Sequence, residues 1–388
     1  MGRTIVTGLD VGTTSVRVAV CEIIKGARHP KVLALVKAES RGLRRGYVIN
    51  QEEASQAIRL ALGEAARQSQ TKIKNVFLGL GGVTLESRIG NSQIVVSRAD
   101  AEITDNDINR AIELAEAELA DMANNRVIHT IPIYFKLDGK KIPGRPEGMR
   151  GAKLEVRALF IVCLEQHLNS LVRAVEVAGV SVNDLVASPI AAALTALSTQ
   201  QKTVGCVLAN IGSQTTSLAV FEDGIPASLQ ILPIGSMDIT NDIALGLRVP
   251  LDEAERLKIN GDQLLTFRKK LDEIIEARLS DMFDLIEVHL KKIGRNGLLP
   301  AGVIITGGGG NIENIAALAK EELRLPARVF TPMGENQGRP ALRDSNWIVA
   351  YGLCLFGLGG DYVEDSAVSQ LLGRTKKTFL HWLKELWP

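Results

Sequence analysis

The 388-residue sequence is poor in aromatic side chains and in cysteine, and its charges nearly balance. Aromatic residues make up 4% of the chain, and its four cysteines lie far apart in apolar runs without a CxxC pair. This pattern argues against a metal site or a disulfide framework and favours buried, reduced thiols. The formal net charge of +1 provides no global field for nucleic acid, so we expect no nucleic-acid partner.

Long apolar runs are also missing. No uninterrupted stretch reaches the roughly 20 residues of a spanning helix, and the first residues lack the basic and apolar regions of a signal peptide. We therefore expect a protein that is neither exported nor transmembrane. What the chain does contain is 46% hydrophobic residues and 36 glycines, a composition typical of α/β proteins, at a length sufficient for two or more domains.

A segment with the pattern strand, tight turn, strand occurs twice, at residues 8–20 (GLDVGTTSVRVAV) and 208–220 (LANIGSQTTSLAV). Glycine lets the main chain approach an anion closely, and Ser and Thr hydroxyls add donors. One copy alone is more simply explained as an ordinary hairpin. Two copies in matching register predict a duplicated fold whose halves hold one polyphosphate, as in the actin-like ATPase superfamily. The candidate phosphate-binding residues are Asp10, Gly12, Thr13, Thr14, Ser15, Asn210, Gly212, Ser213, Gln214 and Thr215.

Two further segments could contact a nucleotide. A strand at 302–306 runs into four glycines, Asn311 and a predicted helix at 312–323 whose N-terminus would face the phosphates, which makes Gly307, Gly308, Gly309 and Asn311 candidates. An ordinary α/β turn explains this run equally well. Glu255 and Lys258 lie one helical turn apart and could bind ribose or adenine edges, although an exposed i,i+3 ion pair is the simpler interpretation.

By these residues the chain resembles the FtsA family of bacterial cell-division actin homologues. The most specific match is the block at residues 233–258, which contains the sequence ITNDIA, and the segment 146–155 and the ITGGGG turn are also similar to the family pattern. The resemblance implies ATP as ligand, with Mg²⁺ near Asp10. It also implies a fold of duplicated ribonuclease-H-type domains with an inserted α+β subdomain, usually called 1C.

The resemblance also gives an expected division of the chain. Subdomain 1A would comprise residues 1–84, 165–198 and 341–358; 1C would be 85–164; 2A would be 199–232 and 300–340; 2B would be 233–299. A linker at 359–372 would lead to an amphipathic helix at 373–388. Within these parts we expect a capped helix at 104–122 and a long surface helix at 272–293, which the family places where it binds the tail of FtsZ.

The chain departs from the family pattern at two positions. Asn210 stands where the family usually has Asp, and Ser188 precedes Pro189 where it often has Glu. An amide keeps the shape of a carboxylate but loses the negative charge that Mg²⁺ attracts. We therefore expect weak or absent ATPase activity with nucleotide binding retained.

The C-terminal segment RTKKTFLHWLKELWP has two of the three tryptophans of the chain. On a helical wheel its apolar residues share one face, opposite basic residues, which is typical of an interfacial membrane helix. Docking of this helix on protein is the alternative. The candidate membrane-binding residues are Phe379, Leu380, Trp382, Leu383, Leu386 and Trp387, with Lys377 and Lys384.

We expect a polymerising, ATP-binding scaffold that tethers FtsZ filaments through its C-terminal helix, on the cytoplasmic side of the membrane at the division site. Its partners would be the FtsZ tail, other copies of itself, an anionic membrane surface and other division proteins. Two alternatives stay open: a PilM-type pilus-assembly protein that binds a partner peptide, and a small-molecule kinase or chaperone-type ATPase.

Overall fold

The computed structural model describes residues 4–24, 30–97, 100–261, 268–331 and 344–358. The expected linker and the expected amphipathic helix at 373–388 lie outside these residues. Among the helices of the described part, none is both long and apolar enough to cross a membrane.

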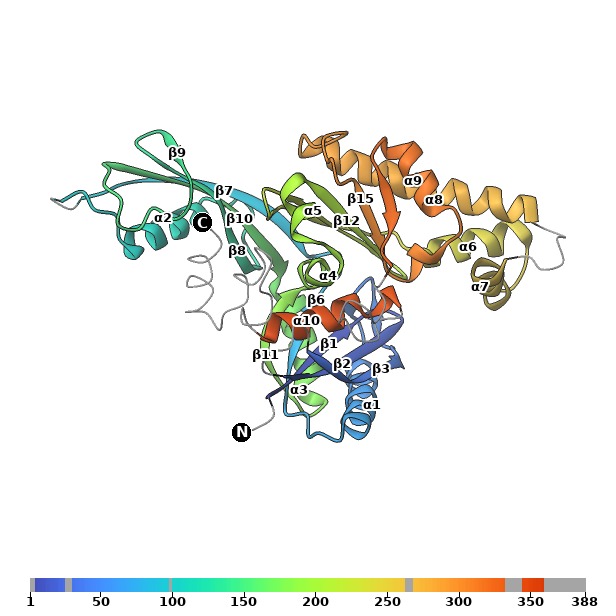
Figure 1. Ribbon diagram of the computed structural model, residues 1–388. Coiled ribbons are helices and arrows are strands. Elements are labelled where there is room, and N and C mark those ends of the chain that lie inside the picture. The colour runs from blue at the N-terminus through green and yellow to red at the C-terminus, as the bar shows by residue number, and fades with distance from the viewer. Residues whose placement is uncertain (1–3, 25–29, 98–99, 262–267, 332–343, 359–388) are drawn as a thin grey trace.

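Two halves of the molecule are built on the same sheet plan (Figure 1). The strand orders are β11-β6-β1-β2-β3 and β16-β15-β12-β13-β14. In each order the first three strands are parallel to one another, and the last two continue the sheet in antiparallel pairs. This identity of order confirms the predicted duplicated α/β fold. The strands are β1 (Thr4–Val11), β2 (Ser15–Ile23), β3 (Lys31–Glu39), β6 (Asn75–Leu80) and β11 (Ser181–Ala187), and then β12 (Cys206–Ile211), β13 (Thr216–Glu222), β14 (Ile225–Leu232), β15 (Val303–Thr306) and β16 (Ala327–Val329).

Helices cover both faces of the first sheet because its strands are apolar on both sides. Val18 and Val20 of β2 belong to the core that includes α1, whereas Ala19 and Cys21 pack with α10. The alternation follows the two-residue period of a strand. The helices of this half are α1 (Gln51–Ser69), α3 (Glu165–Val177), α4 (Ser188–Ala196) and α10 (Ile348–Leu358), the last preceded by a short 3-10 turn, η3 (Ser345–Trp347).

The second half has the same two-sided burial. Ala209 and Ile211 of β12 pack with Phe283 of the long helix, while Leu208 faces the core shared with the first half. One continuous core therefore joins the halves. The helices here are α5 (Thr199–Val204), α6 (Ser236–Leu247), α7 (Leu251–Asn260), α8 (Arg268–Lys292) and α9 (Ile315–Leu323). Helix α8 is the long helix that the sequence predicts at 272–293, and it begins four residues earlier.

An α+β insertion projects from the first half (Figure 1). Its single helix among the described residues begins as expected, with a capping box between Thr104 and Asp107. Ile108 and Ile112 of that helix pack on Phe160 in the sheet, and this forms a separate small core. The elements are β7 (Glu86–Val95), α2 (Asp105–Ala117), β8 (Asn125–Leu137), β9 (Lys140–Ile142) and β10 (Lys153–Leu164).

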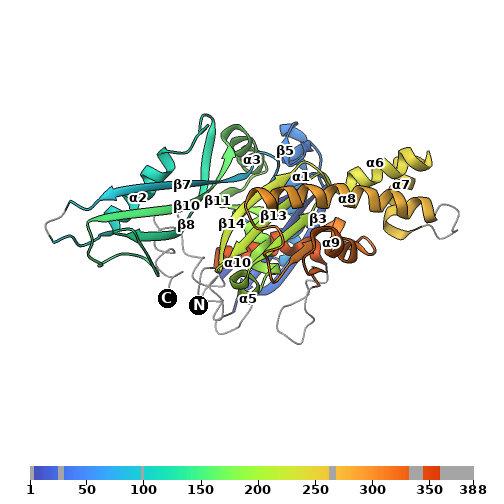
Figure 2. The same ribbon diagram turned by 90° about the horizontal axis from the view of Figure 1, so that it is seen from above.

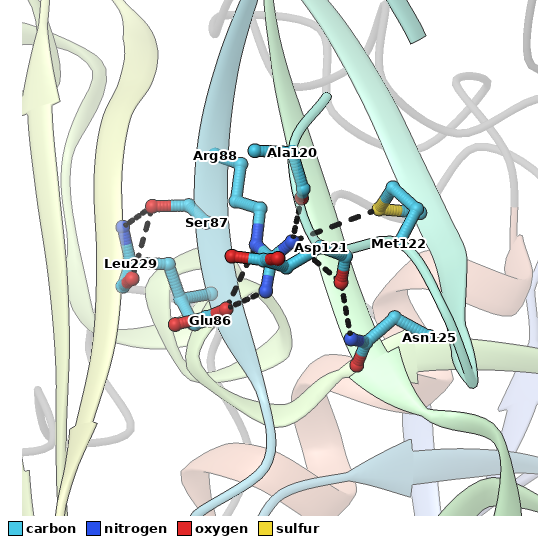
Figure 3. A network of polar contacts seen from close by, with 8 residues as sticks. All are labelled: Glu86, Ser87, Arg88, Ala120, Asp121, Met122, Asn125 and Leu229. Atoms are coloured by element: carbon cyan, nitrogen blue, oxygen red, sulfur yellow. Dashed lines mark hydrogen bonds and ion pairs between the residues drawn. The ribbon is translucent and has the colours of Figure 1, made fainter. Parts of the chain in front are cut away.

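The insertion shares its sheet with the second half (Figure 2). Glu86 of β7 pairs with Gln230 of β14, and this pairing produces a nine-stranded sheet. Beside it the Ser87 hydroxyl donates to the Leu229 carbonyl at 2.9 Å and accepts the Leu229 N–H at 2.7 Å (Figure 3). The insertion is thus covalently part of the first half and hydrogen-bonded to the second.

The expected helix at 104–122 was too long, because α2 ends at Ala117. Asp121, four residues farther on, has a left-handed backbone with φ of 53°, which a helix continuing to 122 could not contain. Arg88 of β7 binds the segment that follows the helix, since its Nη1 donates to the carbonyl oxygens of Ala120 at 2.5 Å and Asp121 at 3.1 Å (Figure 3). This contact comes from a distant strand, so local periodicity cannot reveal it.

Helix α10 lies in direct backbone contact with the elements on both sides of it. A Cβ on Gly352 would come within 1.9 Å of the Ala191 carbonyl oxygen in α4, and one on Gly8 of β1 within 2.1 Å of the Ala350 oxygen. Glycine is needed at these two positions by close approach, since neither has a positive φ.

We predict that Gly352→Ala lowers the free energy of unfolding by about 1–3 kcal/mol, because the added methyl group forces α10 away from α4. Gly63→Ala is the matched control, since Gly63 lies in α1 with nothing within 4 Å of its Cβ position. It should be neutral or stabilising by up to about 1 kcal/mol. Chemical denaturation of both variants checks this, and a Gly352→Ala protein as stable as the parent would contradict it.

Candidate functional site

The two predicted hairpins have the same turn geometry. The Gly12 N–H donates to the Ser15 carbonyl at 3.1 Å, and the Gly212 N–H donates to the Thr215 carbonyl at 2.8 Å. A Cβ on Gly12 would lie 3.1 Å from the first of these oxygens, and one on Gly212 would lie 2.9 Å from the second. A side chain would therefore be crowded at the same position of both turns, and glycine there suits a loop that cradles phosphate.

The tips of both turns are accessible, but not every candidate side chain is. Gly12, Thr13 and residues 212–215 are half-buried and Thr14 is exposed. Ser15 is only 2% exposed, and its hydroxyl has no hydrogen-bond partner among the described residues. Its side chain thus lies behind the turn rather than at its surface, which leaves Thr13 and Thr14 as the accessible hydroxyls of the first hairpin.

One short loop contacts both hairpins. It is the two-residue turn between β4 (Leu43–Arg44) and β5 (Tyr47–Val48), and both of its residues have positive φ. The Gly46 N–H donates to Thr13 Oγ1 at 3.0 Å, and the Arg45 N–H donates to Gln214 Oε1 at 2.8 Å. Thr13 accepts in this bond, so its own O–H stays available to donate to an anion.

The second hairpin is also fixed from behind by α6. The N–H groups of Ser236 and Met237 donate to the carbonyls of Gly212 and Ser213 at 2.9 and 2.8 Å. Gly235 permits this approach, because a Cβ there would lie 2.5 Å from the Ser213 oxygen. These bonds fix the backbone of the turn through its carbonyls.

Asp10 lies beside Arg17, a residue that the sequence reasoning missed. The two are direct partners across the first hairpin, and Arg17 Nη1 is 3.7 Å from Asp10 Oδ2. Burial raises the pKa of Asp10 above its ordinary value, and the nearby Arg17 offsets part of that increase. The signal was present in the sequence, since residues 10 and 17 are equidistant from the centre of the turn.

The glycine run lies between the two hairpins. A Cβ on Gly307 would be 2.4 Å from Asn210 Oδ1, and one on Gly308 would be 3.2 Å from Asn346 Oδ1. Gly308 and Asn311 are exposed, while Gly309 is buried against Ile211. Gly307 is buried beside Asn210, so the bare backbone that a ligand could approach closely is that of the exposed Gly308.

The helix expected to begin at residue 312 was placed too early. Residues Gly308–Asn311 form a 3-10 turn, η1, and α9 begins at Ile315 after Asn314, whose φ is 60°. The left-handed residue redirects the chain before the helix starts. The N-terminus of α9 therefore does not directly follow the glycines and does not face the phosphate site from there.

Glu255 and Lys258 bond to each other rather than pointing freely toward a ligand. Lys258 Nζ donates to Glu255 Oε2 at 2.7 Å, to Thr240 Oγ1 at 2.7 Å and to the Ser236 carbonyl at 3.0 Å. The Lys258 side chain is only 7% exposed, so this is a buried junction between α6 and α7 and not the exposed ion pair of the simpler interpretation. The Glu255 side chain is 44% exposed, so its expected contact with ribose stays a prediction.

The donor set fits a nucleotide better than a protein-only metal cage. No cluster of three or more His, Cys, Asp or Glu side chains suited to a metal occurs in the part of the chain that the structure describes. Mg²⁺ commonly takes one or two carboxylates together with phosphate oxygens and water. Asp10 fits that role for an ion bound mainly through phosphates. The candidate membrane-binding residues lie outside the described ranges.

Comparison with known proteins gives consistent matches over both parts of the molecule. A family model described as "Cell division protein FtsA" matches residues 207–352, and one described as "SHS2 domain inserted in FTSA" matches residues 84–162. The second range covers the insertion seen in the structure.

Curated relatives match over nearly the whole chain. The cell division protein FtsA of Neisseria meningitidis is 30% identical, with 89% of this chain and 88% of the relative covered. Those of Pseudomonas aeruginosa and Bacillus subtilis are each 29% identical, and the matches cover 96% and 90% of this chain and 96% and 82% of the relatives.

Solved structures show the same fold at low identity. The structure titled "PilM-PilN type IV pilus biogenesis complex" matches with a TM-score of 0.66 at 18% identity over 90% of this chain and 97% of that chain. MreB5 of Spiroplasma citri bound to ADP matches with a TM-score of 0.51 at 14% identity over 91% and 95%. These likenesses establish the actin-like fold alone, whereas the family models and the curated relatives agree that the chain belongs to the FtsA cell-division family.

Proposed function

We propose that this member of the FtsA family binds ATP with Mg²⁺ between its two hairpins and uses the bound state to polymerise at the membrane. The observation that carries the proposal is the pair of equivalent turns, each closed by a glycine N–H bond and each joined to the Arg45–Gly46 turn. A ligand held between them would be gripped by both halves at once.

Within this site we expect both backbone and side-chain groups to bind the nucleotide. Backbone N–H groups at the tips of the turns, together with the Thr13 and Thr14 hydroxyls, would donate to phosphate oxygens. The exposed backbone at Gly308 would lie against the base. Mg²⁺, bound with the nucleotide, would neutralise phosphate charge beside Asp10.

Hydrolysis is expected to be slow, because the second hairpin has an amide where the first has a carboxylate. Asn210 and Asp10 occupy equivalent positions, each one residue before the strand end and each paired across its hairpin. Ser188, at the start of α4, has a side chain that is only 7% exposed and carries no charge. Neither residue can accept a proton from an attacking water as a carboxylate would.

The tether requires two more surfaces. We propose that residues 373–388 bind anionic membrane as an amphipathic helix and that the lobe of α6, α7 and α8 takes the FtsZ tail. Three large apolar side chains on α6 and α7 support the second assignment: Leu245, Leu251 and Ile259 are 78%, 57% and 68% exposed. Exposed apolar groups on adjacent helices are typical of a peptide-binding surface.

We predict that Gly212→Val weakens ATP binding at least tenfold. The new side chain would press on the Thr215 carbonyl, which already lies 2.9 Å from the Cβ position, and would force the turn open. Isothermal titration calorimetry with Mg²⁺ and ATP measures the change, and Gly63→Val serves as a control for a bulky residue at a remote, open position. An unchanged dissociation constant for Gly212→Val would rule out this turn as the phosphate cradle.

We predict that Asn210→Asp increases the rate of ATP hydrolysis, because the substitution restores a negative charge beside the metal and its water. Single-turnover assays compare it with Asn210→Ala, which removes the amide without adding charge. If the Asp variant is as slow as the parent, the missing carboxylate at this position does not limit turnover.

We predict that Trp382→Glu abolishes co-sedimentation with anionic liposomes in the presence of ATP. The substitution places a charge on the apolar face of the tail, whereas His381→Glu changes the adjacent residue on the polar face and should weaken binding only about fivefold. The chain truncated after Leu372 sets the background, and neutral lipid tests the charge dependence. Equal pelleting of the two Glu variants would favour docking of the tail on protein.

A further inference from the structure

One face of the sheet in the insertion carries an excess of positive charge. Side chains alternate between the two faces of a strand, and Leu154 and Val156 of β10 face the core that includes α2. The opposite face carries four cations, which we call the basic face: Lys136 of β8, Lys141 of β9, and Lys153 and Arg157 of β10. In the part of the chain that the structure describes, Lys136 alone of these four pairs with a carboxylate, Glu155 Oε2 at 3.6 Å.

The cations of the basic face are gathered around Tyr134 of β8. Lys136 Nζ and Lys141 Nζ lie 5.6 and 5.3 Å from the centre of its ring. Arg157 is the direct partner of Tyr134 on β10, and its Nη1 makes a long bond of 3.5 Å to Asn91 Oδ1. The aromatic ring attracts both ammonium groups and so holds like charges close together. An anion placed here would meet three cations at once.

Two carboxylates share this face, and both are already engaged. Glu155 pairs with Lys136, and Asp138 accepts the N–H groups of Ala152 and Lys153 at 3.0 and 2.8 Å. Four cations and two carboxylates leave a net excess of two positive charges. The ligand chemistry that fits such a face is a short acidic peptide segment with carboxylates a few residues apart.

The chain itself supplies an acidic segment directly after α10. Residues 359–373 contain Asp361, Glu364 and Asp365 but no lysine or arginine, and the next cation is Arg374. The described part of the chain ends immediately before this segment, at Leu358 of α10. The segment therefore has three negative charges to set against the positive excess of the basic face.

Helix α10 ends at the base of the same face of the insertion. Phe356 lies against His129 of β8, with ring centroids 6.4 Å apart. The β10 partners of His129 and Tyr134 are Ile161 and Arg157, which lie an even number of residues apart, so both side chains are on one face of the sheet. A strand rises about 3.3 Å per residue, which puts Tyr134 roughly 16 Å beyond His129.

The acidic segment is long enough to reach the basic face. An extended chain spans at most about 3.5 Å per residue, so Glu364 and Asp365 can lie roughly 20–24 Å from Leu358. Both can therefore cover the distance along β8 to Tyr134 and its neighbours. Asp361 stays within roughly 10 Å of Leu358 by the same measure, closer to the base of the face.

Attachment to the same chain makes such a contact stable where separate partners would part. Exposed ion pairs are individually weak. A segment tethered a few residues away has an effective concentration of about a millimolar, which favours several weak pairs formed together. Because salt screens exposed charges, the contact would weaken as the salt concentration rises.

We propose that the acidic segment at residues 361–365 docks on the basic face of its own chain, with Glu364 and Asp365 paired to Arg157 and Lys141. Docking holds the start of the C-terminal segment beside the insertion. A partner that occupies the basic face would displace the acidic segment, so the state of the insertion controls how the tail is presented. This inference goes beyond the proposed function and does not depend on nucleotide binding.

The first test is carbodiimide cross-linking of the full chain at low salt, because this reagent joins a carboxylate to a lysine amine that contacts it. Peptide mass spectrometry should find residues 361–365 joined to Lys136, Lys141 or Lys153. High salt should lower the yield at least threefold. An equal mixture of ¹⁵N-labelled and unlabelled chains shows whether the joined peptides come from one molecule, as the proposal requires.

A matched pair of variants tests the basic face itself. Arg157→Gln removes a cation of the face without removing a reactive amine, and should lower the yield at least threefold. Arg110→Gln is the control, because Arg110 is an exposed cation on α2, on the other side of the sheet, and should leave the yield unchanged. The link between Glu287 and Lys291, an ion pair of 2.7 Å within α8, calibrates the reaction in every sample.

Anionic liposomes separate the acidic segment from a lipid surface as the occupant. The triple variant Lys136→Gln, Lys141→Gln, Arg157→Gln should co-sediment with them at least as strongly as wild type, since the face binds the chain and not the lipid. A fall of more than twofold would assign the basic face to lipid headgroups and overturn the proposal.

Three cross-linking results would also overturn it: no link from residues 361–365 to the three lysines, links that join labelled to unlabelled chains, or a yield that Arg157→Gln leaves unchanged. The second of these would assign the face to another copy of the chain. Failure of wild type to bind liposomes is a different result. It would refute the proposed membrane tail and leave the cross-linking test of the docked segment standing.

Discussion

Two consecutive N–H groups in the turn between β4 and β5 hold the whole site together. That of Gly46 binds the hairpin of the first half and that of Arg45 binds the hairpin of the second. The turn can point both groups the same way only because both residues have positive φ, and Gly46 is further required because a Cβ would lie 2.6 Å from Gly82 Cα. A change in the separation of the two hairpins must therefore move this turn or break one of its two bonds.

The turn is in its own right anchored to the base of the insertion. His167 Nε2 lies 3.0 Å from the Gly46 carbonyl, which can only accept, so this nitrogen carries the proton. Burial lowers the pKa of His167, which favours the neutral ring, and the bond to the Gly46 carbonyl offsets part of that change. Its Nδ1 then accepts from the Thr84 hydroxyl at 2.6 Å, and Thr84 lies 3.2 Å from Cys163 Sγ. Thr84 and Cys163 stand at the two ends of the insertion, so one buried imidazole links its base to the turn between β4 and β5.

Local sequence signals predicted the parts of this structure that depend on local interactions. The duplicated turns, the Thr104 capping box and the long helix α8 follow from residue type and periodicity over a few positions. The opposition of Asp10 and Arg17 was also within reach, because the register of a hairpin follows from its turn. What failed was the helix start near residue 312 and the helix end near residue 122. Both errors concern segments with a left-handed residue, Asn314 before α9 and Asp121 after α2, and the second segment is also held by Arg88 from another strand.

The pairing of β7 with β14 could not be predicted from the sequence, for a different reason. It joins residues that are far apart in sequence through a single bridge and one serine, and neither Ser87 nor Leu229 has an unusual local pattern. Its consequence is mechanical. The insertion is covalently attached to the first half, bonded at its base to the turn between β4 and β5, and hydrogen-bonded at the start of β7 to the second half. When one half shifts against the other, the insertion must move relative to at least one of them, because its two ends join the first half and its edge is bonded to the second.

The two hairpins show which features a duplication must keep. Their backbone geometry agrees down to the glycine N–H bond that closes each turn, and at both glycines an added Cβ would crowd the carbonyl that accepts this bond. Their paired side chains have diverged completely, to Asp10 with Arg17 in one half and Asn210 with Ser217 in the other. Steric constraint on the backbone thus preserves the shape of the site, while charge at its floor is free to vary between the halves.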